Sequence, residues 1–552
     1  MNINNFYPLL KLDSLSGLIA LAVVFFSLLS LVYSFGFMKG RKGLVQYYTY
    51  FILTALASVG ASLANNLILL LILWGFLGLT LYLLINLAEN ASDTAKKTFI
   101  IIGGSDALML LGIGIIYRLT GTWQMDQINL GLDNGLSILA YILIALASFA
   151  KAGAMPLHSW IPDCAEKAPL PVVAFLPASL DKLLGIYLLA RISLNLFAMN
   201  EAMSVFLMLV GALTVIAAVM MALVQHNMKR LLGYHAVSQV GYMVLGIGTA
   251  NPIGIAGGIF HMLNHAIYKS SLFLTSGNVE SRTHTVELDK LGGLAKSMPL
   301  TYISCLIASL SISGIPPLNG FFSKLMVYQG VVTKLESQGP GLRAVGIFCL
   351  ILALFGSGLT LASFMKLLHS AFLGEAIEKP SHSKKGEVSL SMSAPVLILS
   401  FLCVAFGIFA YALPLKYLIF PAIGYAPGAD NFYSYLSAIL VASGIIIGIA
   451  IFYLGNVKKS IRKENCFTGG EIIGIENKVA GTEFYNTIKD FGAIKNIYRR
   501  AESGSFDIYE ELKKGVFGIG KFLQYLHNGV LPTYLVWTLL GMMGLFWALL
   551  VK

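Results

Sequence analysis

Residues 149–160 read FAKAGAMPLHSW, and this stretch decides how the rest of the chain is interpreted. Lys151 stands inside a long apolar run, and Pro156 follows five positions later. Because proline lacks a backbone donor and its ring clashes with the preceding turn, a helix through this run is expected to break near Pro156. The break would leave Lys151 beside free carbonyl and amide groups, where water can enter even within a membrane.

A second stretch, GIPPLNGFFSK at residues 314–324, is similar to the first. Its first eight residues match residues 153–160 at a constant offset in glycine, proline, leucine and an aromatic ring. A lysine, Lys324, again lies close to the prolines. We interpret the pair as an internal duplication, since interrupted helices in corresponding halves are typical of the transport site of a repeat-built transporter.

Composition places both stretches in a membrane. Of 552 residues, 57% are hydrophobic and 12% are charged, with a mean hydropathy of +0.77, whereas soluble domains average about 25% charged residues. Apolar runs of about 20 residues, each able to cross about 30 Å of hydrocarbon, recur along the chain. We predict an all-α polytopic membrane protein of about fourteen transmembrane helices, near residues 14–37, 44–64, 66–88, 98–117, 136–160, 168–191, 201–225, 234–250, 254–278, 299–335, 343–373, 393–413, 432–455 and 530–550.

Orientation follows from the connections between these spans. The positive-inside rule places connections rich in Lys and Arg in the cytoplasm. All of them fall on one side if the N-terminus is outside, which predicts that both termini face outward. The basic connections are residues 39–42, 96–97, 229–230, 282–290, 384–385 and 458–521, whereas 118–135 and 414–431 on the opposite side are poorer in Lys and Arg.

Several other classes of protein are disfavoured. The net charge of +11 comes mostly from connections rather than from one basic stripe with aromatic partners, which argues against nucleic-acid binding. The sequence contains neither a Walker A motif nor G-x-G-x-x-G, so no nucleotide site is expected. No cleaved signal peptide is expected at residues 1–11. The scattered cysteines form no C-x-x-C pair and do not predict a metal cluster: Cys164, Cys305, Cys349, Cys403 and Cys466.

Charged groups within the predicted spans are the candidates for chemistry. A lysine at the centre of a membrane helix costs about 2.5–3.5 kcal/mol, so each needs a partner, water or a function. A lysine near a helix end can instead extend to the interface, and this alternative is strongest for Lys182 and Lys366. The candidates are Asp106, Lys151, Asp181, Lys182, His261, His265, Lys269, Lys324 and Lys366.

His261, His265 and Lys269 are spaced four residues apart and therefore share one helix face. Together they cover about 12 Å of helix rise, which suits a proton relay through water. Hydrogen-bonded core histidines are the simpler alternative. The H-x-x-x-H spacing also suits zinc, but no convincing third ligand accompanies it.

Asp106 and Asp181 are the only carboxylates well inside the predicted spans. Either could hold a lysine in its charged form until a proton arrives. Alternatively, Asp181 only neutralises its neighbour Lys182, and Asp106 only forms a local cap or pair.

Residues 456–529 are polar, yet apolar side chains recur at helical spacing: Phe484, Ile488, Phe491, Phe506, Tyr509, Leu512 and Val516. This pattern predicts an amphipathic helix along the cytoplasmic membrane surface, after which residues 530–550 re-enter the membrane. A soluble loop with short helices is the alternative.

Four stretches together resemble the antiporter-like subunits of respiratory complex I and its relatives, which include membrane-bound NiFe hydrogenases, formate hydrogenlyases and Mrp-type sodium/proton antiporters. They are KAGAMPLHSWIPD at 151–163, MKRLLGYHAVSQVGY at 228–242, FHMLNHAIYK at 260–269 and GIPPLNGFFSK at 314–324. The resemblance covers residues 12–375. It begins where the family's third helix begins, so the family's first two helices are expected to be missing.

The resemblance implies an inverted-repeat fold with three successive protonatable lysines. These lysines, the histidines that connect them and a carboxylate of the first repeat correspond to Lys151, Lys269, Lys324, His261, His265 and Asp106. The implied organisation is 1–43 as an N-terminal transmembrane helix, 44–191 and 192–375 as two repeats, 376–455 as further transmembrane helices, 456–529 as a lateral helix and 530–552 as its anchor.

One position departs from the family pattern. The family carries a glutamate directly after the tryptophan of the third span, but Gly75 follows Trp74 here. The carboxylate that normally tunes Lys151 is therefore missing. Either Asp181 or Asp106 substitutes for it, or the first half-channel is inactive or serves another ion.

Together, these residues and the resemblance predict a proton-translocating, antiporter-like subunit of a multi-subunit redox complex in a prokaryotic cytoplasmic membrane. A hydrogenase is preferred over an NADH:quinone oxidoreductase as the setting. No cofactor is expected on this chain; iron–sulfur clusters and a NiFe centre or flavin would lie in partner membrane and peripheral subunits. Asp181 and Lys182 are added to the predicted proton path. The alternatives are an Mrp-type sodium/proton antiporter subunit and a structural membrane subunit with an inactive first half-channel.

Overall fold

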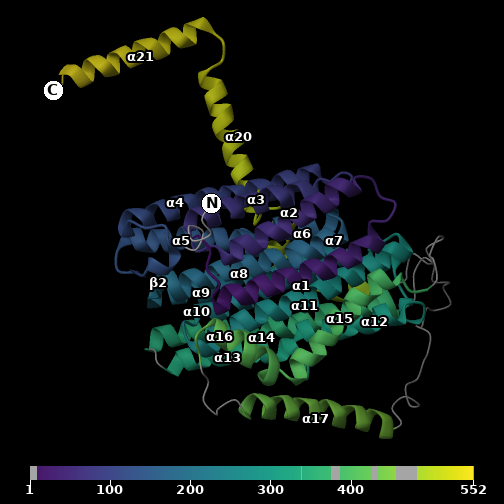
Figure 1. Cartoon of the computed structure of the whole chain (residues 1–552). Coiled ribbons are helices and arrows are strands. Elements are labelled where there is room, and N and C mark those ends of the chain that lie inside the picture. The colour runs from purple at the N-terminus through teal and green to yellow at the C-terminus, as the bar shows by residue number, and fades with distance from the viewer. Residues whose placement is uncertain (1–8, 337–338, 375–385, 426–431, 456–480, 551–552) are drawn as a thin grey trace. The chain divides into compact units, whose positions relative to one another are not determined.

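The computed structural model describes residues 9–336, 339–374, 386–425, 432–455 and 481–550 (Figure 1). Contacts divide the chain into two compact units, Met1–Asp490 and Phe491–Lys552. The larger unit contains, in chain order, α1 (Ser14–Phe37), α2 (Leu44–Leu63), α3 (Leu67–Ile85), α4 (Ser92–Thr120), α5 (Gly135–Ala152), α6 (Trp160–Lys167), α7 (Leu170–Phe175), α8 (Asp181–Arg191), α9 (Glu201–Leu223), α10 (Met228–Gly248), α11 (Pro252–Thr283), α12 (Pro299–Ser313), α13 (Asn319–Glu336), α14 (Pro340–Leu368), α15 (Leu390–Ile408), α16 (Phe420–Ala422) and α17 (Phe432–Leu454).

The remaining elements of this unit are short. π-Helical turns lie at Leu176–Leu180, Ile192–Leu196, His369–Leu373 and Tyr411–Ile419, and 3-10 helices at Met125–Gln127, Leu288–Lys290, Leu294–Lys296 and Gly481–Asp490. Strands β1 (Leu130–Gly131) and β2 (Phe197–Ala198) pair in parallel over two residues. The prediction of an all-α fold is confirmed.

Asparagine side chains set the starts of five long helices. Each accepts a hydrogen bond from a backbone N–H two or three residues later, which satisfies a donor that the helix itself leaves free. The five are Asn66 before α3, Asn134 before α5, Asn200 before α9, Asn227 before α10 and Asn251 before α11.

Eleven helical segments among the described residues are long and apolar enough to cross a membrane: Ser14–Phe37, Leu44–Leu63, Leu67–Ile85, Ser92–Thr120, Gly135–Ala152, Leu170–Leu196, Glu201–Leu223, Pro340–Leu373, Leu390–Ile408, Leu436–Leu454 and Leu531–Leu550. The chain is thus a polytopic membrane protein, with fewer such helices than the fourteen predicted. The other three predicted spans correspond to α10, α11 and the pair α12–α13. Helices α10 and α11 are buried along almost their whole length, so neighbouring helices rather than lipid surround their polar side chains.

Both predicted helix breaks are confirmed. α5 ends directly before Gly153 (φ 82°), and α6 starts at Trp160. α12 ends directly before Gly314 (φ 81°), and α13 starts at Asn319. Glycine adopts this left-handed conformation without the steric cost of a Cβ atom, which makes it the usual residue after a helix end. The two breaks therefore begin with the same local geometry.

A third interruption was not predicted. Within the expected span 168–191, α7 passes into the π-helical turn Leu176–Leu180 and then into α8. All five residues of this turn are buried. Single π-turns inside helices occur frequently at functional sites, and this one directly precedes Asp181 and Lys182.

Helix α11 connects the helices before it in the larger unit with the helices after it. It packs against three helices that precede it in the chain, α7, α8 and α10. It also packs against three helices that follow it, α12, α13 and α15. Figure 1 shows the long helices of this unit side by side, with α11 among them. A side chain on α11 can therefore contact groups from helices earlier or later in the chain.

The smaller unit contains α19 (Gly492–Glu502), α20 (Ile508–Leu526) and α21 (Leu531–Leu550). Of the predicted lateral segment 456–529, residues 456–480 lie outside the described residues. The 3-10 helix Gly481–Asp490 belongs to the larger unit, so the described part of this segment consists of separate helices. The lateral position of the segment stays a prediction.

Candidate functional site

The candidate side chains are almost all enclosed by the protein. Eight of the nine are 5% exposed or less: Lys151, Asp181, Lys182, His261, His265, Lys269, Lys324 and Lys366. Asp106 is partly buried. Neither Lys182 nor Lys366 extends over the outer surface of the bundle, as the interface alternative requires.

Lys151 lies at the first break and contacts α3. Its Nζ donates to the backbone oxygen of Trp74 at 3.2 Å and stands 4.9 Å from the centroid of the Trp74 ring. An ammonium group over an indole face is attracted by the ring quadrupole. The carboxylates of Asp181 and Asp106 both act electrostatically on Lys151.

Asp106 reaches from α4 toward two glycines of α3. Its Oδ2 lies 3.9 Å from the position that a Cβ on Gly75 would occupy and 3.7 Å from the corresponding position on Gly78. Its Oδ1 is buried without a hydrogen-bond partner in the described part of the chain. No described contact therefore supports the alternative that Asp106 only caps or pairs locally.

Lys182 also lies at the first break. Its Nζ is 3.4 Å from the position of a Cβ on Gly153 and 5.7 Å from the Trp160 ring centroid. Asp181 interacts electrostatically with both Lys151 and Lys182, so it does more than neutralise its neighbour. The π-turn before α8 is thus followed by a carboxylate that interacts with two lysines.

His261 on α11 is fully buried in a polar cluster. Its Nδ1 is 2.9 Å from Ser323 Oγ, and its Nε2 is 3.1 Å from Gln239 Oε1 and 3.3 Å from the hydroxyl of Tyr268. Ser323 directly precedes Lys324, so His261 connects α11 with the second break.

His265 and Lys269 lie one and two turns after His261 on α11. Lys269 Nζ has no hydrogen-bond partner among the described residues, and the backbone of Ala178 is the group that approaches the His265 ring. Lys269 acts electrostatically on His265 and interacts with Lys182. Within the described chain, no group of three or more His, Cys, Asp or Glu side chains could hold a metal ion.

Lys324 lies at the second break. Its Nζ donates to the backbone oxygen of Ile312 at 2.8 Å and to Ser357 Oγ at 3.0 Å, and it stands 4.7 Å from the Tyr242 ring centroid. Like Lys151, Lys324 thus stands over an aromatic ring and donates to a backbone carbonyl, although the carbonyl of Ile312 lies at the end of α12 and that of Trp74 lies within α3.

Lys366 is separate from both breaks. Its Nζ donates to the backbone oxygens of Leu223 at 2.6 Å and Gln225 at 2.8 Å, where α9 ends. A cation is favourable at the negative end of a helix dipole, so this contact stabilises the end of α9.

Three residues of the candidate site were missed by the sequence analysis. His235, Gln239 and Tyr242 follow one face of α10, at positions i, i+4 and i+7, and all are fully buried. His235 Nε2 is 2.8 Å from Ser363 Oγ. A search of the predicted span 234–250 for polar residues on one face would have found them.

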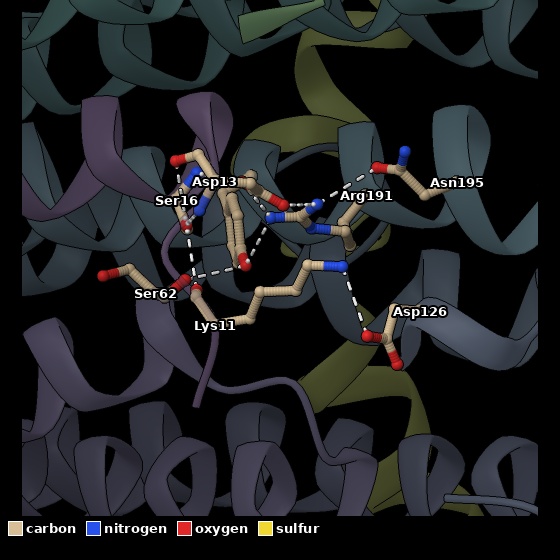
Figure 2. Close-up of polar contacts among 8 residues, drawn as sticks. Lys11, Asp13, Ser16, Ser62, Asp126, Arg191 and Asn195 are labelled. Carbon is tan, nitrogen blue, oxygen red and sulfur yellow. Dashed lines mark hydrogen bonds and ion pairs between the residues drawn. The ribbon is translucent and has the colours of Figure 1, made fainter. Parts of the chain in front are cut away.

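A polar cavity of about 220 Å³ lies beside the residues that precede α1 and α3, and none of the buried lysines lines it. Figure 2 shows the polar contacts among several of its lining residues. Arg191 donates to both carboxylate oxygens of Asp13, at 2.6 and 2.9 Å, and Lys11 Nζ lies 3.2 Å from Asp126. Burial alone would raise the pKa of Asp13, but hydrogen bonds from Arg191 and from the backbone of Ser16 lower it to about 2.

Residues 64–348, more than half of the chain, match the model of the transmembrane family described as NADH:quinone oxidoreductase/Mrp antiporter. The chain belongs to this family. The match includes both helix breaks and all of the candidate residues except Lys366.

Members of the NADH:quinone oxidoreductase/Mrp antiporter family from three kinds of complex are similar to the chain. The Na(+)/H(+) antiporter subunit A1 of Staphylococcus haemolyticus is 32% identical, over 76% of this chain and 55% of that protein. NADH-quinone oxidoreductase subunit N of Desulforudis audaxviator is 32% identical, over 74% of this chain and 85% of that protein. Hydrogenase-4 component B of Escherichia coli is 29% identical, over 74% and 63%. The chain thus spans between half and two thirds of the length of these antiporter and hydrogenase proteins.

Solved structures of large complexes contain chains with the same fold. A chain of the Mrp complex from Dietzia sp. DQ12-45-1b has a TM-score of 0.68 and 25% identity, covering 78% of this chain and 86% of that one. A chain of the membrane-bound sulfane sulfur reductase, an archaeal respiratory membrane complex, has a TM-score of 0.77 and covers 98% and 89%; at 23% identity this likeness concerns the fold alone.

Proposed function

We propose that this chain is a proton-translocating, antiporter-like subunit of a multi-subunit membrane complex. The observation that carries the proposal is a buried line of ionisable side chains that starts at the first break, follows α11 and ends at the second break. We call it the lysine–histidine row: Lys151, Asp181, Lys182, Lys269, His265, His261 and Lys324.

Burial without a direct hydrogen-bond partner distinguishes two lysines of this row, Lys182 and Lys269, from structural polar residues. A buried charge that lacks a partner costs several kcal/mol, and a structural lysine avoids this cost by pairing or by reaching water. Among the described residues, neither Lys182 Nζ nor Lys269 Nζ has a direct hydrogen-bond partner. Water between the side chains, and a change of protonation state, would relieve the cost.

Electrostatic repulsion along the row would move a proton. A proton that arrives on Lys269 disfavours a second positive charge on Lys182, because the two side chains interact within a medium of low dielectric constant. Asp181 then holds the displaced positive charge between Lys151 and Lys182. Moving one charge against the membrane potential needs about 2.3 kcal/mol per 100 mV, which pairwise terms of this kind can supply.

The setting we propose is a redox complex of a prokaryotic cytoplasmic membrane, with both termini outside and with the separate helices of residues 481–529 lying along the membrane surface. Iron–sulfur clusters and a NiFe centre or flavin would then lie in partner subunits. A hydrogenase remains our preferred setting, supported by the similarity to hydrogenase-4 component B. The identity to Na(+)/H(+) antiporter subunit A1, 32%, exceeds the 29% identity to the hydrogenase component. It favours a second candidate, a sodium/proton antiporter subunit without redox input.

Purification of the complex through a tag on this chain would separate these settings. Co-purifying subunits that contain nickel, flavin or iron–sulfur clusters would support the redox setting. Sodium-dependent proton exchange in liposomes without an electron donor would instead support the antiporter.

Lys324→Ala in the reconstituted complex tests the transport function itself. We expect proton translocation to fall by at least about tenfold, while electron transfer is less affected. Lys334→Ala is the matched control, because Lys334 lies in the last turn of the same helix, α13. This variant should keep wild-type flux. Unchanged translocation in Lys324→Ala would contradict the proposal.

A further inference from the structure

Helix α14 carries a second line of polar residues, which rests on the proposed function but is not part of the lysine–histidine row. Ser357, Thr360, Ser363 and Lys366 are spaced three residues apart, so each neighbours the next on the helix surface. Together they cover about 14 Å of helix rise. We call these four residues the α14 ladder.

The Ser357 end of the ladder contacts the second break. Ser357 Oγ accepts a hydrogen bond from Lys324 Nζ at 3.0 Å and donates to the backbone oxygen of Ser313 at 3.1 Å. Thr360, one turn further, is fully buried and donates to the backbone oxygen of Gly356 at 2.8 Å. Both hydroxyl oxygens keep acceptor capacity for a further proton donor.

His235 contacts the middle of the ladder. It is fully buried on α10, and its Nε2 is 2.8 Å from Ser363 Oγ. Its Nδ1 has no hydrogen-bond partner among the described residues, although a buried unsatisfied group of this kind is unfavourable. A titratable ring with one bonded and one free nitrogen is suited to receive a proton on one side and release it on the other.

The surroundings of His235 join the ladder to the lysine–histidine row. Its ring centroid is 4.6 Å from that of Phe364, and Lys269 Nζ is 5.8 Å from the same Phe364 ring. The charged groups that act on His235 are Lys269, Lys324 and Lys366, from α11, α13 and α14. One turn along α10, Gln239 bonds to His261 of the row.

The other end of the ladder approaches groups that are exposed to solvent. Asp289, Glu483 and Lys489 are the charged groups that interact with Lys366. Asp289 accepts from Thr482 Oγ1 and pairs with His226 at 2.8 Å. The side chains of His226 and Asp289 are 32% and 39% exposed, so water reaches this end of the larger unit.

We propose that the α14 ladder and His235 form a branch that carries protons between the solvent-exposed groups near Lys366 and the lysine–histidine row. A proton passes from Ser363 Oγ to His235 Nε2, and Ser363 regains one from the water or hydroxyl beside it. His235 then releases its Nδ1 proton toward Lys269. The ring ends neutral in its other tautomer, and rotation of the ring restores the starting state, so charge and atoms balance.

Proton flux into liposomes that contain the full reconstituted complex tests this branch. A potassium diffusion potential set by valinomycin drives the flux, and a pH-sensitive dye inside reports it. His235→Gln keeps a hydrogen-bonding group beside Ser363 but cannot titrate, and we expect the flux to fall at least about tenfold. Ser363→Ala should lower it severalfold. Ser204→Ala is the matched control and should leave the flux unchanged. It removes an equally buried hydroxyl, which among the described residues donates to the backbone oxygen of Gly248 on α10.

A double variant separates a shared path from independent structural damage. If His235 and Ser363 act in series, His235→Gln/Ser363→Ala will be no slower than His235→Gln alone, whereas independent defects would multiply. If His235→Gln does not assemble, Thr360→Val carries the test, because it removes a ladder hydroxyl at nearly constant volume. Wild-type flux in His235→Gln and Ser363→Ala, with flux abolished in Lys324→Ala, would overturn the branch and leave the proposed function standing. Wild-type flux in Lys324→Ala would instead overturn the proposed function.

Discussion

Asp106 Oδ2, on α4, lies 3.9 Å from the position that a Cβ on Gly75 of α3 would occupy. A glutamate at residue 75, which the resemblance to the family implies, would therefore start from a Cβ beside the carboxylate of Asp106. Asp106 also acts electrostatically on Lys151, the lysine that such a glutamate would tune. We infer that a carboxylate from the neighbouring helix compensates for the missing one, which favours a working first half-channel over an inactive one.

Asp106→Asn is expected to lower proton flux at least about tenfold, because Lys151 loses one of its two carboxylate partners. The flux assay in liposomes measures this effect. Adding Gly75→Glu to Asp106→Asn should restore much of the flux, since a carboxylate from α3 then starts from a Cβ beside residue 106. Asp93→Asn, whose side chain is 99% exposed at the start of α4, serves as the control. Full flux in Asp106→Asn would show that the first half-channel does not depend on this carboxylate.

Asp13→Asn is expected to lower the stability of the solubilised chain by about 1–2 kcal/mol, allowing for solvent screening at a half-buried site. Two hydrogen bonds from Arg191, drawn in Figure 2, are weakened, and both residues line the polar cavity. The pKa of Asp13 is lowered from 3.8 to about 2 by the fold, so its contribution is complete above about pH 5 and is lost as the pH falls toward 2.

Thermal unfolding in detergent from pH 5 to pH 8 tests this assignment. The difference between wild type and Asp13→Asn should stay constant across that window, because Asp13 is ionised throughout in both folded and unfolded chains. Asp126→Asn, which removes the exposed ion pair with Lys11, should change stability by less than about 1 kcal/mol. A difference that closes between pH 8 and pH 5 would contradict the assignment.

Local chemistry explains what could be predicted from the sequence. Proline and glycine control backbone geometry within a few residues, so the breaks before Trp160 and Asn319 follow from the sequence alone. The four-residue spacing of His261, His265 and Lys269 likewise defines one face of α11 without knowledge of its neighbours. These features depend on nothing outside their own helix.

Tertiary packing explains what could not be predicted. The π-turn before Asp181 turns Lys182 toward Gly153, although its place in the sequence indicated a helix end near the interface. The polar face of α10 is tolerated because other helices enclose it, so hydropathy assigned the helix without showing its role. The approach of Asp106 to Gly75 depends on how α3 and α4 pack, which no single-helix pattern encodes.

Lys182→Met is the last test, because it separates a lysine that carries protons from one that only supports the break. Methionine fills a similar volume without charge, and Asp181 keeps Lys151 as a cationic neighbour, so assembly should be preserved. If Lys182 and Lys151 act in series, Lys182→Met should lower proton flux at least about tenfold, and Lys151→Met added to it should cause little further loss. Lys167→Met is the control, because the side chain of Lys167 is 50% exposed, and it should keep wild-type flux. Normal flux in Lys182→Met would remove this residue from the path and leave Asp181 as the direct link between Lys151 and α11.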